Sequence, residues 1–189
     1  MTHIINIAGT SGSGKSTVVR RLIEVARYGE TLYRSDKEMG RIVYLGERSV
    51  FIAGRYDQYD TAGCDVIKDV RFWYDTVYEK SEQYNVVFEG LFVMNHQRGI
   101  DLMSQIRPRR SCTMHIINLT TSWEDCQASI NERRARRGKG EFRGDLDNVK
   151  GHIIRANNFA SKLRQRGAIV YNLERETAVN KLVEIAGCP

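Results

Sequence analysis

The segment Gly9–Thr17, with the sequence GTSGSGKST, constrains this chain more than any other part of it. It satisfies the pattern GxxxxGK[ST] in full. It directly follows an apolar run at 3–8 that has the length of a buried strand, and a helical pattern begins at Lys15. A glycine-rich loop between a strand and a helix wraps phosphate groups with its backbone N–H groups. The alternative is a chance glycine turn, but the order of strand, loop and helix favours a phosphate-binding loop (P-loop).

Each residue type in this loop has a predicted task. The glycines allow the backbone to curve tightly and to approach phosphate oxygens without a Cβ clash. Lys15 is predicted to reach the β and γ oxygens, and the hydroxyl of Ser16 to ligate Mg²⁺. ATP and Mg²⁺ are therefore the predicted cofactors. The predicted nucleotide-binding residues are Gly9, Thr10, Ser11, Gly12, Ser13, Gly14, Lys15, Ser16 and Thr17.

Short apolar runs alternate with longer helical patterns along the rest of the chain. Strands are predicted at 3–8, 86–89, 113–119 and 168–173, with a weaker one at 31–34. Helices are predicted at 15–27, 65–84, 122–137, about 149–163 and 179–185. This alternation is typical of an α/β fold with a mainly parallel sheet, here of five strands. The segment 41–56 departs from it, and we expect an inserted hairpin over the sheet edge.

Composition limits the organisation and the partners. The 189 residues contain no Pro-rich or Ser/Gly-rich linker, so one domain over 1–189 is expected. Lys and Arg number 29 against 23 Asp and Glu, and the surplus lies at 98–189, which hold 17 basic and 10 acidic side chains. That excess suits an anionic partner without identifying it. No apolar run approaches the roughly 20 residues of a membrane span, so a cytoplasmic protein without a membrane partner is expected.

A P-loop alone does not separate kinases from GTPases and motors. The chain has no convincing NKxD or DxxG element of a GTPase, and it is short for a motor ATPase. A small phosphotransferase is therefore the favoured class.

Two acids suit such an enzyme. Asp36 follows the weak strand at 31–34, at the carboxyl end where open parallel sheets bind their ligands. It is the predicted general base for an acceptor hydroxyl, with a helix cap as the alternative. Glu89 ends the run VVFEG and is predicted to hold Mg²⁺, with an ordinary carboxylate at a strand end as the alternative.

A basic run with the sequence NERRARRGKG ends the helix predicted at 122–137. Arginines that close over a transferring phosphoryl group neutralise its charge and exclude water. Arg133 and Arg137 are the predicted catalytic members of an arginine-rich lid at about 133–145. The alternative is a solvated helix end whose charges complement the helix dipole.

Together these motifs resemble the P-loop nucleoside and nucleotide kinases. That resemblance implies a P-loop kinase fold whose acceptor site lies over the carboxyl end of the sheet, with an arginine-bearing lid. Asp36 also matches the position of the base in polynucleotide 5′-hydroxyl kinases. A narrower resemblance, to the bacteriophage 5-hydroxymethyluracil DNA kinases, rests on GTSGSGKST, on GRYDQYDTAGCD (Gly54–Asp65) and on VVFEGLFV (Val86–Val93). It implies transfer of the γ-phosphate of ATP to the hydroxymethyl group of a modified pyrimidine within DNA.

The segment GRYDQYDTAGCD combines rings that stack on a base with carboxylates that accept its N–H groups. The predicted substrate-binding residues are Tyr56, Asp57, Tyr59, Asp60 and Asp65. A polar loop with a helix cap is the alternative. Further arginines expected to meet DNA phosphates are Arg107, Arg109, Arg110 and Arg143. Two other functions stay open, namely a kinase of a free deoxynucleoside or its monophosphate, and a nucleotide-binding module without phosphotransfer.

Overall fold

The computed structural model describes residues 1–34, 36–57, 63–91, 93–109, 111–142 and 146–188, with the backbone alone for 146–148. This part of the chain forms a seven-stranded sheet in the order β2-β3-β4-β5-β1-β6-β7. The strands are β1 (Thr2–Ala8), β2 (Arg27–Arg34), β3 (Lys37–Leu45), β4 (Arg48–Ala53), β5 (Asn85–Glu89), β6 (Cys112–Leu119) and β7 (Ile169–Leu173). Strand β3 is antiparallel to both of its neighbours, and all other pairs are parallel. Six strands therefore point their carboxyl ends to the same edge.

The sequence predicted the central strands correctly but not the size of the sheet. The four predicted apolar runs are β1, β5, β6 and β7, and the weaker one is the end of β2. The five-stranded sheet is wrong, because the segment 41–56 forms a hairpin within the sheet instead of over its edge. Strand β4 pairs with β5 in the register Phe51↔Val86, and Val50 to Ala53 are buried. Burial on both faces makes β4 a central strand.

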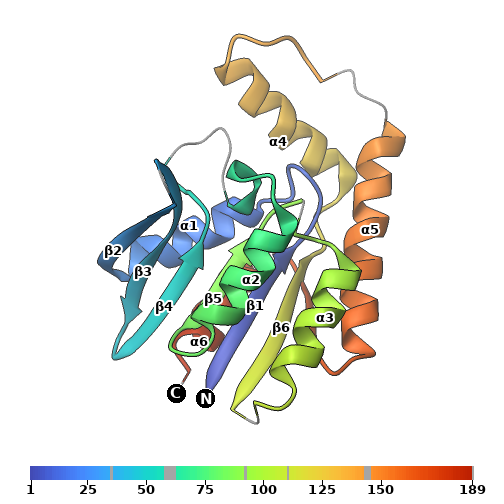
Figure 1. The fold of residues 1–189 in the computed structure, drawn as a ribbon. Coiled ribbons are helices and arrows are strands. Elements are labelled where there is room, and N and C mark those ends of the chain that lie inside the picture. Colours follow the sequence, from blue (N-terminus) through green and yellow to red (C-terminus); the bar gives the residue numbers. More distant parts are fainter. Residues whose placement is uncertain (35, 58–62, 92, 110, 143–145, 189) are drawn as a thin grey trace.

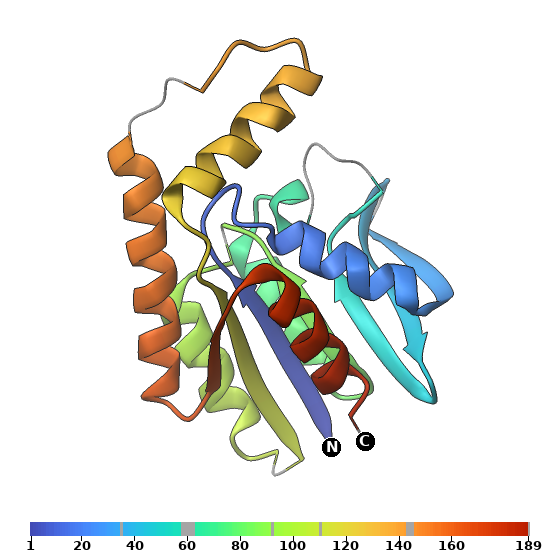
Figure 2. The same ribbon diagram turned by 180° about the vertical axis from the view of Figure 1, so that it is seen from behind.

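Helices cover both faces of the sheet. They are α1 (Lys15–Val25), α2 (Val70–Lys80), α3 (His96–Ile106), α4 (Trp123–Arg136), α5 (Leu146–Arg164) and α6 (Arg175–Ala186), with a short 3₁₀ helix η1 (Cys64–Val66). Figures 1 and 2 show α2, α3 and α5 on one face, and α1 and α6 on the other. One core packs around Trp73, Phe88 and Phe159, and the other around Ile7 and Leu182. No helix in the described ranges is both long and apolar enough to cross a bilayer.

The helices predicted after the P-loop and at 122–137, 149–163 and 179–185 are confirmed as α1, α4, α5 and α6. The single helix expected at 65–84 is wrong, because the chain forms η1 and then starts again as α2. Asp69 sets this restart, since its side chain accepts a hydrogen bond from the N–H of Phe72 at 2.9 Å. Helix α3 was not predicted. Its local signal is Asn95, which caps it by accepting from the N–H of Arg98 at 3.1 Å.

The connections at the carboxyl edge of the sheet carry the motifs. The P-loop joins β1 to α1, and Glu89 ends the neighbouring strand β5. Helix α4 begins close to the P-loop, where Thr121 Oγ1 donates to the carbonyl oxygen of Ser13 at 2.9 Å, and it then extends above the sheet (Figure 1). The fold thus brings the glycine-rich loop, the buried acid and the basic helix end to one edge.

Candidate active site

The P-loop is tightly curved and holds its own lysine. Lys15 Nζ donates to the carbonyl oxygen of Thr10 at 2.9 Å, and Ser13 Oγ donates to the same oxygen at 2.9 Å. Gly12 has φ +80°, and a Cβ there would lie 2.2 Å from the carbonyl oxygen of Cys126. Only glycine fits this position, because any side chain would meet the backbone of α4. The curvature of the loop therefore depends on glycine, and this curvature is what allows backbone N–H groups to surround a phosphate.

Lys15 is buried among acids. Only 7% of Lys15 is exposed to solvent. Burial lowers the pKa of the Lys15 amine, whereas the charges of Glu89 and Asp65 act in the opposite direction. Phosphate oxygens beside the amine would likewise favour its charged form.

Glu89 and Ser16 form a hydrogen-bonded pair that fits Mg²⁺. Ser16 Oγ donates to Glu89 Oε1 at 2.7 Å, and Glu89 is 2% exposed. Burial raises the pKa of the Glu89 carboxyl to about 7; Asp65 adds to the increase, while Lys15 and Ser16 oppose it. The described residues contain no cluster of three or more His, Cys, Asp or Glu that could cage a metal. Mg²⁺ suits such a sparse oxygen site, because it keeps waters and takes substrate phosphates as further ligands.

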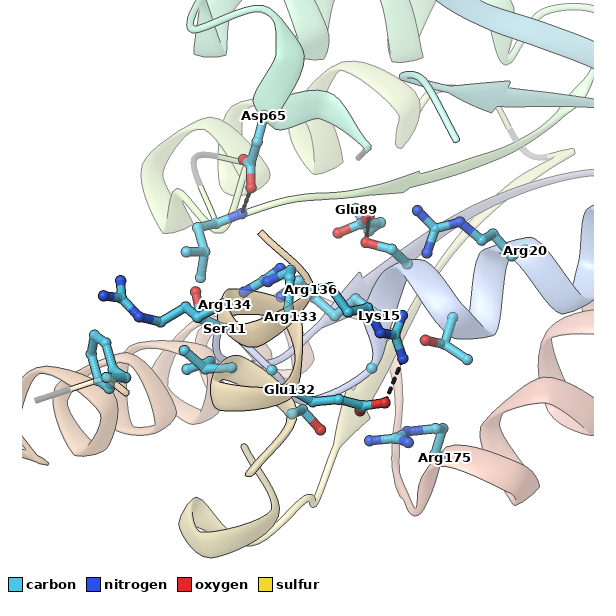
Figure 3. A pocket seen from close by; sticks show the side chains of 18 of the residues that line it. Ser11, Lys15, Arg20, Asp65, Glu89, Glu132, Arg133, Arg134, Arg136 and Arg175 are labelled. Atoms are coloured by element: carbon cyan, nitrogen blue, oxygen red, sulfur yellow. Dashed lines mark hydrogen bonds and ion pairs between the residues drawn. The ribbon is translucent and has the colours of Figure 1, made fainter. Parts of the chain in front are cut away.

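A cavity of about 1080 Å³ opens over this pair, bounded by the P-loop, η1, α4, α5 and the start of α6. Eight cationic and four acidic side chains line it, so its charge is strongly positive. The cations are Lys15, Arg20, Arg21, Arg133, Arg134, Arg136, Arg137 and Arg175. The acids are Glu24, Asp65, Glu89 and Glu132. Figure 3 shows most of these side chains around the P-loop. A cavity of this size and charge suits a polyphosphate together with a second anionic substrate.

The basic end of α4 lies over the P-loop. Arg133 and Arg137 both line the cavity, and so do the two arginines next to them. Arg134 Nε donates to the carbonyl oxygen of Gly140 at 2.7 Å, which holds the chain after α4 back against the helix. Residues 143–145 of the predicted lid lie outside the described residues. Closure of this segment and the catalytic roles of Arg133 and Arg137 stay predictions.

Asp36 lies outside this cavity. It is exposed in the turn between β2 and β3. The turn is at the carboxyl edge as predicted, but β2 is the outermost strand, three strand spacings of about 4.8 Å from β5. A strand follows Asp36, so the alternative as a helix cap is wrong. Asp36 is absent from the described residues that line the cavity, and its role as the base stays a prediction.

The structure separates the predicted substrate-binding residues. Tyr56 is 4% exposed and packs in the core under α1, with its hydroxyl donating to the carbonyl oxygen of Ala53 at 3.3 Å. We therefore correct the expectation for Tyr56, because a ring in the core has no face open to a base. Asp57 is exposed, pairs with Arg55 at 3.4 Å and does not line the cavity. Tyr59 and Asp60 lie outside the described residues. Asp65 does line the cavity.

The arginines expected to meet DNA outside the lid are not at the cavity. Arg107 and Arg109 follow α3 and precede β6, where β6 pairs with the start of β1, so they lie at the opposite end of the sheet (Figure 1). Arg109 pairs with Glu82 at 2.8 Å and lies 3.9 Å over the ring of Tyr78, which is a structural role. Neither arginine lines the cavity, a point that the sequence alone left open. Arg110 and Arg143 lie outside the described residues.

Arg175 was not predicted as a site residue. It starts α6 and lies against the P-loop, since a Cβ at Gly14 would be 2.3 Å from its Nε. Within the described part of the chain this buried Nε has no hydrogen-bond partner. Its sequence signal was weak, namely an arginine two residues after the strand predicted at 168–173. His152 and Phe142 also line the cavity without having been predicted.

Comparison with known proteins agrees with this geometry. Residues 4–150 match the protein family described as AAA domain. The chain is also 28% identical over 194 aligned residues to a protein of Pseudomonas phage PaMx11 named 5-hmdU DNA kinase. The alignment covers 97% of this chain and 96% of that protein. The match confirms the resemblance to phage 5-hydroxymethyluracil DNA kinases that the motifs predicted.

Proposed function

Because the chain belongs to the AAA domain family, with its P-loop inside the matched residues 4–150, we propose that it is an ATP-dependent kinase acting on DNA. The acceptor is the hydroxymethyl group of 5-hydroxymethyluracil, and the donor is the γ-phosphate of ATP. The near full-length similarity to a phage 5-hmdU DNA kinase supports this choice of acceptor. A kinase acting on phage DNA would meet both ATP and DNA in the host cytoplasm.

One observation carries the proposal, namely the contact of Ser16 with Glu89 beside Lys15, within a strongly cationic cavity. Lys15 would bind the β and γ oxygens, and Ser16 and Glu89 would hold Mg²⁺, which neutralises charge that develops on these oxygens. Arg133 and Arg137 extend over the same space from α4 and would stabilise the transferring phosphoryl group.

The transfer needs one proton acceptor. The hydroxymethyl oxygen forms a bond to the γ-phosphorus while the bond from that phosphorus to the bridging oxygen of ADP breaks. The hydroxyl proton passes to a carboxylate of the protein, for which the sequence offered Asp36. ADP carries away the negative charge of the broken bond.

The location of the P-loop within the cavity limits how a nucleotide of DNA could bind. A base in a duplex cannot reach the P-loop, so the modified nucleotide must leave the stack. The cavity volume of about 1080 Å³ is at the upper end of the range for small-molecule sites, roughly 300–1,000 Å³, and offers room for ATP together with a flipped nucleotide. Its arginines offer contacts to the phosphates that flank the flipped base.

The test uses ATP labelled at the γ-phosphate and three acceptors. These are an oligonucleotide with one 5-hydroxymethyluracil, the same oligonucleotide with thymine, and free 5-hydroxymethyldeoxyuridine monophosphate. We expect label in the first alone, with activity that falls steeply as salt increases. Lys15→Ala is the control for contaminating kinases and should show no transfer. Label on the free nucleotide alone would contradict a DNA acceptor.

A further inference from the structure

We propose that one face of α5, formed by Arg155, Lys162 and Arg166, binds the phosphate backbone of the DNA duplex beside the nucleotide that enters the cavity. We call this surface the basic face of α5. The inference rests on the proposed function and deepens it, because it names the surface that holds the DNA outside the active site. Contacts to phosphates supply affinity and orientation but no sequence preference.

The charge of α5 and of the turn after it has one sign. Residues 149–167 include no acidic side chain and five basic ones. Two of these, Lys162 and Arg164, lie in the last turn of α5, where cations complement the helix dipole. That effect falls off within one turn, so it does not account for Arg155 in the middle of the helix. A helix of this charge suits an anionic partner.

The three cations lie along one side of α5. Arg155 and Lys162 are seven residues apart, which is close to two helical turns. Arg166 follows in the turn that continues the helix, where its N–H donates to the carbonyl oxygen of Leu163 at 3.0 Å. All three are exposed, and none of them forms a salt bridge within the described ranges. Their charges are therefore available to a ligand.

The basic face begins at the active-site cavity. His152 lines that cavity and lies about one turn before Arg155. Burial lowers the pKa of His152, and the charge of Arg155 adds to this decrease, so Arg155 is close enough to act at the cavity wall.

Helix α5 then runs from the cavity toward the opposite end of the sheet (Figure 1). At 1.5 Å per residue, the chain rises by about 21 Å from His152 to Arg166. A duplex covers that length with about six base pairs at 3.4 Å each. A nucleotide in the cavity and about six base pairs beside it can thus contact one continuous surface.

The basic face ends at a second cationic cavity, with a volume of about 570 Å³. Arg107, Arg109 and Arg166 line it, and no acid is among its described lining residues. Arg109 already pairs with Glu82 at 2.8 Å, so its charge is not counted toward DNA binding. Arg107 forms no salt bridge within the described part of the chain, so together with Arg166 it offers a further place for a phosphate.

The test measures binding of a fluorescent duplex with one central 5-hydroxymethyluracil, without ATP, over a range of salt concentrations. The triple variant Arg155→Gln, Lys162→Gln, Arg166→Gln removes three charges and keeps polar side chains at these positions. We expect the plot of log K against log salt to become shallower by about 3, and the Kd at low salt to increase about tenfold or more. Because the contacts are to phosphates, a duplex with thymine should show the same loss.

Two comparisons separate this surface from the active site and from net charge. The labelled ATP assay should show a higher KM of the triple variant for the duplex with kcat and the Kd for ATP unchanged, because none of the three residues lines the active-site cavity. Arg155→Gln alone should flatten the salt plot by about 1. Its matched control is Lys181→Gln on α6, which covers the other face of the sheet (Figure 2) and should leave the plot unchanged.

Three results would overturn the inference while the proposed function stands. One is a salt plot of the triple variant whose slope is within about 0.5 of that of the unaltered protein, since about 0.9 is expected for each phosphate contact. The second is a loss of affinity confined to the modified duplex. The third is equal flattening by Lys181→Gln and Arg155→Gln. If the unaltered protein labels the free nucleotide alone, or no acceptor at all, the proposed function itself fails, and the inference fails with it.

Discussion

The substitution Gly63→Ala should displace the carboxylate of Glu89 from its position in the predicted metal site. Gly63 has φ +68°, and a Cβ there would lie 2.4 Å from Glu89 Oε1 and 2.7 Å from the main-chain oxygen of Glu89. Ordinary contact begins at about 3.4 Å, so the Glu89 carboxylate or the loop must move by about 1 Å. A displacement of that size at a catalytic site costs about 100-fold in rate. The backbone of Gly63, with φ +68° and ψ −152°, lies in a region that is essentially limited to glycine, which adds about 1–3 kcal/mol of lost stability for alanine.

A matched control separates these two effects. Gly46 also has a positive φ, +59°, but a Cβ there meets nothing within 4 Å. It lies in the turn between β3 and β4, at the end of the sheet away from the P-loop. Gly46→Ala should therefore lose stability through its positive φ without losing activity.

The assay is a titration of the kinase reaction with Mg²⁺ at saturating ATP, together with thermal unfolding of both variants. We expect Gly63→Ala to need more Mg²⁺ and to reach a kcat about 100-fold lower, while Gly46→Ala follows the wild-type titration. Equal kinetics for the two variants would refute the reasoning, because the position of Glu89 would then not matter for catalysis.

Three further predictions test other parts of the molecule. Arg133→Ala should lower kcat by about 100-fold or more if the guanidinium stabilises the transferring phosphoryl group, as measured in the labelled ATP assay. Arg109→Ala should lower the melting temperature and leave the salt dependence of DNA binding unchanged in a fluorescence titration, since Arg109 already pairs with Glu82 and lies over the ring of Tyr78. Burial lowers the pKa of His115 from 6.5 to about 4, and His3, whose ring nitrogen lies 3.0 Å away, adds to this. Protonation therefore disfavours the folded state, and urea unfolding should show a stability that falls by up to about 3 kcal/mol as the pH decreases from 6.5 to 4, a decrease that His115→Gln should reduce.

The sequence was sufficient where local pattern and chemistry coincide. The P-loop, the strand before it and Glu89 could be predicted because each depends on a short motif with a fixed place in a parallel sheet. The cap of α4 is also local, since Ser122 accepts from the N–H of Asp125 at 3.1 Å. These features place the nucleotide side of the site.

The acceptor side could not be predicted in the same way, because it depends on pairing between distant strands. Strand β4 inserts beside β5, and β3 then separates β2 from it, which moves Asp36 two strands further from the P-loop. Tyr56 follows strand β4, and its side chain packs in the core. Asp65 lies at the cavity because the segment after β4 passes the end of β5. There the Asp65 carboxylate accepts a hydrogen bond from the N–H of Leu91. None of these positions follows from spacing along the chain.

The most direct test of the account is a crystal structure with a non-hydrolysable ATP analogue, Mg²⁺ and a short oligonucleotide containing 5-hydroxymethyluracil. We predict that the modified base leaves the stack, with its hydroxymethyl oxygen about 3–3.5 Å from the γ-phosphorus and within hydrogen-bond distance of a carboxylate of the protein. Mg²⁺ should contact Ser16, directly or through water, near Glu89. A modified base that stays stacked in the DNA, or a hydroxymethyl group directed away from the P-loop, would contradict the account.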